Sequence, residues 1–486
     1  MAKRVAVIDI GSNSVRMVIY EKTSRYAFHL LHEAKSKVRI SEHAYTHGGK
    51  LQEVPMRRTF LALKEFLTIA DSYKVKKTLC VATSALRDAP NKKDFLKKVK
   101  DALKLNIKVI DGEKEAYYGG VACLNLLPKL HSALSIDIGG GSTEFTIIDE
   151  KNITNTLSLD IGTVRLKELF CDSHKLTEAT QYIDSKLEFL DNITISTLVG
   201  IGGTFRAISK AIMENSNYPL NKIHAYEYSD TIFKTFIVNI LEANEKELKI
   251  LGIERNRFDV IKPGALILQR VLQKLSSVNI ITSGVGVREG VYLCDLLRNS
   301  NDKFPHNYNT SVKHIIDSHI DNKSFSNQLN TLSKKIFNLT YKYLNIDKQF
   351  RYELALAAKL YPSGNSVHFY SQNKHAYYLI QSALEYGFTH QSITLIATLI
   401  KYTKNKLPVQ SHLQKYEMLL PQKSTTYALS YILSLSIALL SHRPRNLDFK
   451  LDFIDNILYI KSDNDLYLSQ NAVKKIECEQ NFSIQF

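Results

Sequence analysis

The sequence predicts an α/β protein of two similar lobes, followed by a third, mainly helical domain. Three observations support this. β-Branched strands alternate with amphipathic helices through roughly the first three hundred residues. A strand–glycine turn–strand unit at 7–17 recurs as a stronger copy at 135–145. From about Arg298 glycine becomes scarce and the periodicity is helical. A chain of 486 residues has room for two to four domains of ordinary size.

The first lobe is expected over residues 1–125. Its opening segments are β-branched and separated by Gly-Ser-Asn, which is typical of a hairpin. Segments whose apolar residues recur every 3.6 positions, as in a helix, then alternate with uninterrupted apolar runs, as in a buried strand. The expected elements are strands at 4–10 and 14–20, a helix at 60–73, a strand and loop at 77–85, a helix at 92–105, a strand at 106–111 and a helix after Gly112.

The second lobe is expected over residues 126–303, because the same order restarts at Ala133. Its elements are a strand and glycine turn leading into a strand at 142–149, helices up to about 195, a strand, glycine turn and helix start at 195–209, and another such unit from 279. The two lobes should therefore consist of two parallel series of strands and helices.

The third domain is expected over residues 304–486. The polar stretch at 298–311 breaks regular structure and is typical of a linker. Beyond it the pattern is helical and rich in tyrosine, until the segment 447–468 alternates like a late pair of strands. The apolar stretch 427–440 predicts a buried or amphipathic helix; it is too short and too rich in serine to span a bilayer.

The net charge of +16 and a pI near 9.3 predict an acidic partner. Nucleic acid, an anionic membrane surface and a phosphate-rich small molecule all fit that balance. The cysteines are odd in number and form no CxxC pair, which argues against disulfides and thiolate zinc sites. We interpret them as small buried hydrophobic residues of a reducing compartment: Cys80, Cys123, Cys171, Cys294 and Cys478. The N-terminus lacks a signal-peptide pattern, so a soluble, cytoplasmic protein is expected.

The repeated glycine turns are typical of anion sites. A strand followed by a glycine-rich turn directs several backbone N–H groups into one small volume, where phosphate binds readily. The hydroxyl side chains that follow add further donors. Neither turn fits the Walker pattern or GxGxxG. The candidate phosphate-binding residues are Gly11, Ser12, Asn13 and Ser14 in the first copy, and Gly139, Gly140, Gly141, Ser142 and Thr143 in the second.

Each glycine turn is preceded by an aspartate, Asp9 or Asp137. A carboxylate aimed at a phosphate would repel it unless a cation lies between them. The pair therefore predicts a hard divalent cation, Mg²⁺ above all, bound partly through water. The alternative is that each aspartate merely caps its own turn, and the repetition of the pattern argues against it.

Six motifs occur in an order that resembles the exopolyphosphatase/guanosine pentaphosphate phosphohydrolase (Ppx/GppA) family. They are "DIGSNSVRMVI", "VATSALRDA", "DGEKEAYYGG", "DIGGGSTEF", "GIGGTFRAI" and "VREGV". The family is part of the acetate and sugar kinase/Hsp70/actin superfamily, so the resemblance implies two actin-like (ribonuclease H-like) lobes over about residues 3–297. It also implies activity on inorganic polyphosphate and guanosine penta- or tetraphosphate, a homodimer, and no membrane or specific nucleic acid as partner.

The resemblance assigns roles residue by residue. Glu115 matches the general base that activates the attacking water, although Lys114 stands where many relatives have a second glutamate. Arg87 matches an arginine that contacts phosphate, with a salt bridge to a nearby acid as the alternative. Glu144 joins Asp9 and Asp137 as a ligand of Mg²⁺ or Mn²⁺. The glycines of the third turn, Gly202 and Gly203, are added to the phosphate-binding set.

The sequence also departs from the family pattern. Gly284 replaces an aspartate of S-D-G-x-x-R-E-G, so we expect Arg288 and Glu289 to serve only the structure of the lobe. In the third domain "LYPSGN" stands where relatives have a His-Glu pair, and no histidine is followed by aspartate. This domain is therefore expected to be a degenerate relative of the His-Asp phosphohydrolases, with a basic docking surface that includes 401–406 and 442–445.

The leading hypothesis is thus an exopolyphosphatase that also converts guanosine pentaphosphate to the tetraphosphate. An ATP-dependent kinase of the same superfamily is the alternative enzyme, and a polyphosphate or alarmone sensor without catalysis is the alternative outside enzymes. The kinase would need an acceptor site and a base serving an alcohol, and the sequence shows neither.

Overall fold

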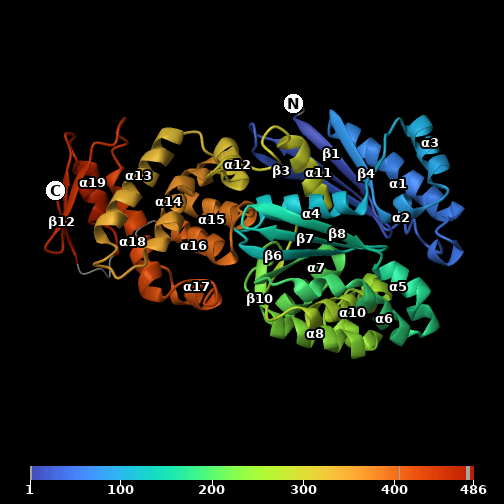
Figure 1. Cartoon of the computed structure of the whole chain (residues 1–486). Coiled ribbons are helices and arrows are strands. Elements are labelled where there is room, and N and C mark those ends of the chain that lie inside the picture. The colour runs from blue at the N-terminus through green and yellow to red at the C-terminus, as the bar shows by residue number, and fades with distance from the viewer. Residues whose placement is uncertain (1–2, 404–405, 478–481) are drawn as a thin grey trace. The chain divides into compact units, whose positions relative to one another are not determined.

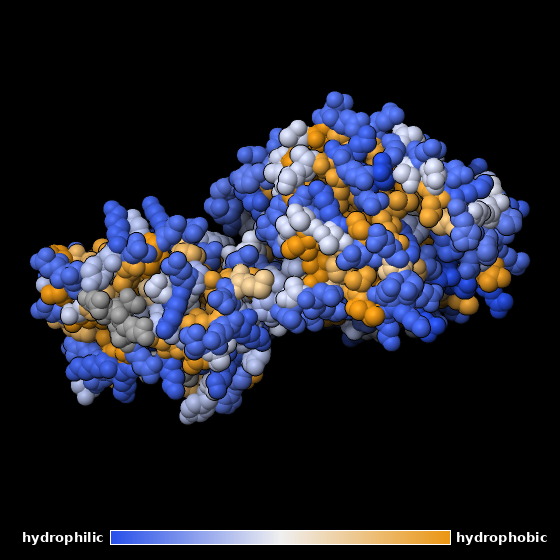
Figure 2. Space-filling view, turned by 90° about the horizontal axis from the view of Figure 1, so that it is seen from below, coloured by the Kyte–Doolittle hydropathy of each residue, from blue (hydrophilic) through white to orange (hydrophobic). Residues whose placement is uncertain are grey.

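The computed structural model of the chain describes residues 3–403, 406–477 and 482–486. The chain divides into two compact units, one ending at Tyr308 and the other running from Asn309 to Phe486 (Figure 1). On the face of each unit seen in Figure 2, hydrophilic residues predominate and hydrophobic ones are scattered among them. Within the described residues, no helix is both long and apolar enough to cross a membrane.

The first lobe is built on a five-stranded sheet, shown in blue in Figure 1. Its order is β3-β2-β1-β4-β5, with β1, β2 and β3 antiparallel and β4 and β5 parallel to β1. The predicted hairpin of β1 and β2 is confirmed. The elements are β1 (Arg4–Ile10), β2 (Val15–Lys22), β3 (Phe28–Ser36), α1 (Glu53–Ser72), β4 (Lys77–Ala82), α2 (Ser84–Asp88), α3 (Lys92–Leu103) and β5 (Lys108–Val109).

The second lobe is built on a six-stranded sheet of order β10-β11-β9-β6-β7-β8. Here too an antiparallel hairpin, β6–β7, lies beside a parallel strand, β9. Both sheets are therefore mixed, with antiparallel and parallel strands. The elements are β6 (Ser132–Ile138), β7 (Thr143–Asp149), β8 (Asn152–Leu159), α5 (Thr163–Leu169), α6 (Leu176–Lys186), β9 (Thr197–Ile201), α7 (Gly202–Asn215), β10 (Tyr226–Ser229), α8 (Asp230–Glu242), α9 (Glu245–Ile250), α10 (Phe258–Lys274), β11 (Asn279–Thr282) and α11 (Val287–Leu296).

Helix α4 (Gly112–Leu126) follows the first sheet in the chain but packs on the second. The hydroxyl of Thr146 on β7 donates to the carbonyl of Ala116, at 2.8 Å. A Cβ on Gly112 would lie 2.3 Å from the Cβ of Ser158 on β8, so glycine is required for this approach. The first turn of α4 is therefore held close to the second sheet.

The C-terminal unit is mainly helical, as predicted, and ends in a small sheet of order β12-β13-β14. Helix α18 is buried along almost its whole length, which confirms the buried helix predicted from its apolar run. The predicted strand pair is present as β12–β13 and is antiparallel, whereas β14 was not predicted. The elements are α12 (Thr310–His319), α13 (Lys323–Thr340), α14 (Arg351–Leu360), α15 (Gln372–Ala383), α16 (His390–Lys401), α17 (Gln410–Lys415), α18 (Lys423–Leu439), β12 (Lys450–Ile454), β13 (Ile457–Lys461), α19 (Tyr467–Val473) and β14 (Ser483–Gln485).

The cysteines depart partly from expectation. Cys80 and Cys123 are buried, while Cys171 and Cys294 are partly exposed, and all four are free thiols. Burial raises the pKa of the Cys294 thiol to about 12, with nearby Asp302 acting in the same direction. Such a thiol stays protonated and has low reactivity. Cys478 lies outside the described residues.

Candidate active site

The glycine turns of both lobes line one cavity of about 410 Å³. It lies where β1 and β6 end, because each of those strands leads directly into its own glycine turn. Most of the residues singled out in the sequence contribute to its wall: Asp9, Gly11, Ser12, Asn13, Ser14, Glu115, Asp137, Gly139, Gly140, Ser142, Glu144, Gly202 and Gly203.

The two glycine turns have the same local geometry and face each other. In the first, Gly11 N–H donates to the carbonyl of Ser14 at 3.1 Å; in the second, Gly139 N–H donates to the carbonyl of Ser142 at 2.9 Å. A Cβ on Gly140 would lie 2.8 Å from the Cβ of Ser12, so the turns are in close contact. A phosphate between them would be within reach of donors from both lobes.

Three predicted residues lie beside the cavity. Gly141 faces Tyr45, since an added Cβ would meet that hydroxyl oxygen at 2.1 Å. The hydroxyl of Thr143 donates to the carbonyl of Ile161, which lies between β8 and α5. Arg87 forms an ion pair with Glu115, Nη1 to Oε2 at 3.1 Å. The structure therefore contains the salt bridge that the sequence analysis gave as the alternative role of Arg87.

Four carboxyl groups are crowded at one side of the cavity. Burial raises the pKa of Asp9, and it raises the pKa of Asp137 to about 6. Burial is also the main reason that the pKa of Glu144 rises to about 8. The pKa of Glu115 is raised well above its usual range by burial and by the charge of Glu144, and Arg87 opposes that rise. Such a group of acids is stabilised when a cation neutralises it.

The fit of these acids to a divalent cation is partial. No three His, Cys, Asp or Glu side chains come together as ligands of one metal ion, as far as the described residues go. Asp9 Oδ1 is buried without a hydrogen-bond partner, which suits a group that binds a cation. Glu144 Oε1 accepts a hydrogen bond from Ser158 at 2.8 Å. The donor set fits a hydrated Mg²⁺ held by one or two carboxylates better than it fits an ion enclosed by protein.

The lining of the cavity is also strongly basic, and the sequence analysis missed this. Six cationic side chains contribute to it: Arg16, Lys35, Lys37, Arg206, Arg257 and Arg288. Burial, together with the charges of neighbouring arginines, lowers the pKa of Lys35 to about 8. Burial lowers the pKa of Arg206 to about 10, again with nearby arginines adding to the effect. A bound polyanion would relieve this repulsion.

Two sequence signals could have located part of this basic side. Arg16 directly pairs with Asp9 across the β1–β2 hairpin, so its place beside the first turn follows from the hairpin register. Arg206 lies four residues after Gly202 on α7, and its Nε donates to the Gly202 carbonyl at 2.9 Å. Lys35 belongs to β3, a strand that was not predicted, and it pairs with Arg16.

Arg288 corrects another expectation, because it lines the cavity. It also forms an ion pair with Glu33 at 2.7 Å. The carboxylate of Glu289 is held by hydrogen bonds within the lobe. It accepts one from the Tyr20 hydroxyl at 2.5 Å and one from Gly286 N–H at 2.8 Å. At Gly284 an added Cβ would lie 2.8 Å from the Cβ of His224, so the aspartate of relatives would not fit there without a shift.

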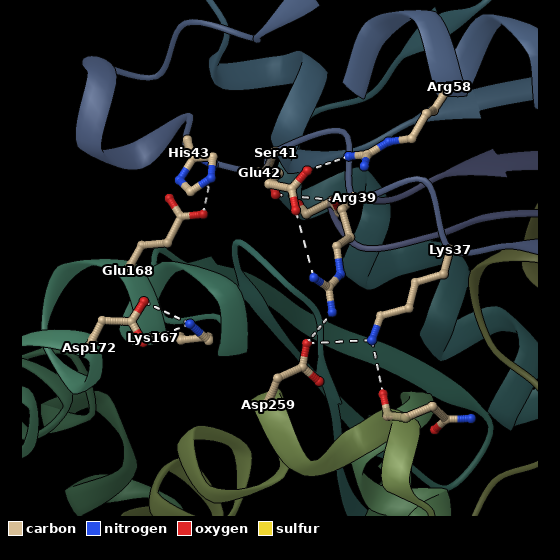
Figure 3. Close-up of polar contacts among 12 residues, drawn as sticks. Lys37, Arg39, Ser41, Glu42, His43, Arg58, Lys167, Glu168, Asp172 and Asp259 are labelled. Atoms are coloured by element: carbon tan, nitrogen blue, oxygen red, sulfur yellow. Dashed lines mark hydrogen bonds and ion pairs between the residues drawn. The ribbon is translucent and has the colours of Figure 1, made fainter. Parts of the chain in front are cut away.

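A segment of the first lobe, residues 37–45, crosses to the second lobe beside the cavity (Figure 3). We call it the crossing segment. Asp259 on α10 accepts from Arg39 at 2.6 Å and pairs with Lys37 at 3.4 Å. Glu168 on α5 accepts from the backbone N–H groups of His43 at 2.9 Å and Tyr45 at 3.3 Å.

Comparisons with known proteins agree with this geometry. A model of the Ppx/GppA phosphatase family matches residues 18–299, and a model of Ppx/GppA phosphatase domain III matches residues 309–480. A guanosine-5'-triphosphate,3'-diphosphate pyrophosphatase of Photobacterium profundum is 26% identical over 496 residues, covering 99% of this chain and 95% of that protein. A bifunctional 3-dehydroquinate synthase/phosphatase of Fusobacterium nucleatum is 33% identical over 301 residues, 57% of this chain. The chain spans 44% of that longer protein.

Solved structures similar to the chain match about three fifths of it. An exopolyphosphatase from Cytophaga hutchinsonii is 26% identical with a TM-score of 0.57, covering 62% of this chain and 100% of that one. The Ppx/GppA family member of Aquifex aeolicus is 29% identical with a TM-score of 0.53, covering 62% of this chain and 99% of that one.

Proposed function

Because the chain belongs to the Ppx/GppA phosphatase family, we propose that it removes the terminal phosphate from inorganic polyphosphate and the 5′ γ-phosphate from guanosine pentaphosphate. Its two actin-like lobes and helical C-terminal part are those of the family. The observation that carries the proposal is a single cavity with two facing glycine turns, a buried glutamate and a basic wall. This combination suits the end of a chain of phosphates.

In this proposal Glu115 orients and deprotonates the attacking water. Hydrolysis of a phosphoanhydride needs a water in line with the leaving oxygen and a carboxylate within hydrogen-bond reach of it. Arg87 donates a hydrogen bond to Glu115 and would share its guanidinium with the phosphoryl group. The glycine turns donate backbone N–H groups to the terminal phosphate, and the basic wall receives the following ones.

A divalent cation, Mg²⁺ or Mn²⁺, belongs to the same proposal. Asp9 and Asp137 would hold it, with Glu144 on the second sheet beside Asp137 in register. The cation would supply positive charge against the phosphate oxygens. We further propose a cytoplasmic homodimer whose chain divides into lobes at 1–125 and 126–303 and a third domain at 304–486.

The test is a side-by-side measurement of phosphate release from long polyphosphate and from guanosine pentaphosphate, with purified full-length protein and Mg²⁺. Release from either substrate supports the proposal, and the ratio of the two kcat/KM values gives the preference. Tight binding of both substrates without release would replace it with the sensor hypothesis. Phosphate transfer from ATP to an alcohol, without polyphosphate hydrolysis, would favour a kinase.

A further inference from the structure

The carbonyl groups of the second glycine turn are bound by the start of helix α5. The N–H of Thr163 donates to the Gly139 carbonyl at 3.0 Å, and the N–H of Val164 donates to the Gly140 carbonyl at 2.8 Å. The N–H of Arg165 donates to the same Gly140 carbonyl at 3.0 Å. The first N–H groups of α5 are therefore engaged with the turn, and they draw its carbonyls to one side.

The side chain of Arg165 extends this contact to the third glycine and to the first lobe. Its Nε donates to the Gly141 carbonyl at 2.7 Å, and its Nη2 donates to Asp88 at 2.8 Å. Asp160 lies further from the same Nη2, at 3.5 Å. The guanidinium also lies over the ring of Tyr45, 4.7 Å from its centroid. Asp88 belongs to α2 and Tyr45 to the crossing segment, so one side chain joins the turn of the second lobe to two elements of the first.

A bond that fixes a carbonyl also fixes an N–H group. In a planar trans peptide unit the C=O and the N–H point in opposite directions, and the described residues contain no cis peptide bond. The Gly141 carbonyl shares its peptide unit with the N–H of Ser142, a residue that lines the main cavity. The bond from Arg165 therefore directs that N–H away from α5. The positive charge of the guanidinium also polarises the unit, which makes the N–H a stronger donor.

We propose that Arg165 is a positioning residue for the second glycine turn. It lines a neighbouring cavity of about 170 Å³ behind the turn, so it acts through the Gly141–Ser142 peptide unit and does not touch the phosphate. The inference rests on the proposed function, because the Ser142 N–H is one of the donors that would bind the terminal phosphate. Its second bond, to Asp88, makes the orientation of the turn depend on the place of the first lobe.

The first experiment measures affinity for a methylene-bridged triphosphate analogue, which cannot be hydrolysed, by calorimetric titration of the full chain with Mg²⁺ present. Arg165→Gln should weaken binding by roughly 10- to 100-fold, the range for one lost charged hydrogen bond. The matched control is Arg270→Gln, because Arg270 pairs with Asp184 at 2.6 Å within the second lobe. Equal affinities of Arg165→Gln and Arg270→Gln would overturn the proposal.

Arg165→Lys tests the need for two bonds from one side chain. An ammonium group keeps the charge but lacks the planar fork that reaches the Gly141 carbonyl and Asp88 together. We expect a loss of several-fold, smaller than that of Arg165→Gln. Wild-type affinity in the lysine variant would overturn the link to Asp88.

Added guanidinium separates the role of the side chain from a general loss of structure. Arg165→Ala opens a space next to the cavity of about 170 Å³, which a free guanidinium ion can enter. Guanidinium at millimolar concentration should restore part of the affinity of this variant, and the same concentration of urea should not. A loss that guanidinium does not reduce would assign Arg165 a purely structural role and overturn the proposal.

Phosphate release from tripolyphosphate distinguishes a failure of this proposal from a failure of the proposed function. Wild-type protein that binds the analogue but releases no phosphate would contradict the proposed hydrolysis, and the affinities would still decide the role of Arg165. Wild-type protein that hydrolyses tripolyphosphate, together with Arg165 variants that bind the analogue normally, would contradict the positioning role alone.

Discussion

At the scale of single residues, Glu115 is the group on which turnover should depend most. It is buried on the first turn of α4, faces the cavity and is paired with Arg87. We predict that Glu115→Gln keeps substrate binding but lowers kcat by roughly 10²–10⁴-fold, the usual contribution of a general base. The control is Glu113→Gln, on the exposed side of the same turn. Turnover of Glu115→Gln within a few-fold of wild type would show that another group activates the water.

The crowded carboxyl groups give a prediction about metal. Without a cation, Asp9 and Asp137 would repel the phosphate, so activity should be lost on exhaustive chelation and return with Mg²⁺ or Mn²⁺. Asp137→Ala should lower activity by about 10²-fold or more and remove its dependence on added metal. Asp149→Ala, the same change at the exposed end of β7, should behave as wild type. Full activity after chelation contradicts this prediction.

His412 in the C-terminal unit gives a prediction about pH. Burial lowers its pKa to about 4, and the charges of Lys401 and Lys415 act in the same direction. Its Nε2 lies 2.9 Å from the Thr398 hydroxyl and its Nδ1 3.3 Å from Lys401 Nζ. The surrounding rings are those of Tyr377, Tyr402 and Tyr416.

Because the pKa of His412 is lower in the folded state, its contribution to stability is complete above the unfolded pKa of about 6.5. It is lost as the pH falls towards 4, by up to about 3 kcal/mol. Urea unfolding followed by circular dichroism between pH 7 and pH 4 measures this loss. His412→Gln should flatten that part of the pH dependence. An unchanged pH profile would mean that His412 is readily protonated in the folded protein.

At the scale of elements, the crossing segment links the two lobes through Glu168 and Asp259 (Figure 3). Glu168→Ala removes the acceptor of two backbone N–H groups, and hydrogen bonds to charged groups contribute about 1.5–3 kcal/mol each. Since Lys37 at one end of the segment lines the cavity, we predict that KM rises by roughly 10-fold while kcat stays near wild type. Trypsin should also cleave at Lys37 or Arg39 faster.

Asp172→Ala is the control for that substitution. Asp172 pairs with Lys167, at 2.6 Å, and both belong to the second lobe. It therefore removes a carboxylate a few residues from Glu168 without releasing the crossing segment. Equal KM values for Glu168→Ala and Asp172→Ala would show that the segment does not shape the cavity.

Elements with a strong local pattern were predictable from the sequence, and long-range pairings were not. Both glycine turns and their strands were located from the local residue pattern alone. The strand β3 was missed because it is half exposed along its length and lacks clean alternation. Because this strand was not predicted, the position of Lys35 beside the cavity was not predicted either. The contacts of the crossing segment join residues such as His43 and Glu168, 125 positions apart, and neither carries a local signal of its partner.

At the scale of the whole molecule, the helical unit should matter more for long substrates than for short ones. Long polyphosphate extends beyond a cavity of about 410 Å³, and the excess must lie along protein surface. We predict that a chain ending at Tyr308 loses affinity for long polyphosphate more than for short chains, with the difference shrinking at high salt. KM values for both substrates, in both proteins and at two salt concentrations, test this. An equal loss in folded protein would assign the unit a purely structural role.

The position of the cut follows from the structure. Asp302 accepts from the Tyr117 hydroxyl at 2.8 Å, and Phe304 N–H donates to Asn125 at 3.1 Å. Phe304 also stacks on Tyr308, at 5.5 Å between centroids. A cut near residue 303 would remove Phe304 with its contacts, whereas a cut after Tyr308 keeps them.

The basic stretches expected to guide polyphosphate are partly engaged within their own unit. Lys401 lies over the ring of Tyr377, 4.7 Å from its centroid, and Arg443 lies 3.4 Å above Phe325. His442 pairs with Ser469 at 3.1 Å. Lys404 and Asn405 of the first stretch lie outside the described residues. The guiding role of these stretches stays a prediction, which the salt dependence above addresses.

The packing of α4 determines which lobe Glu115 would move with. This helix packs on β7 and β8 through Gly112 and Ala116. Its first turn would therefore move together with the second sheet. Arg87 is carried by α2 beside the first sheet, and its bond to Glu115 therefore joins the two lobes. Any rotation that widens the cavity would pull the guanidinium away from the carboxylate while leaving Glu115 in register with Asp137. Opening for substrate entry and release of the base from its arginine would then be the same motion.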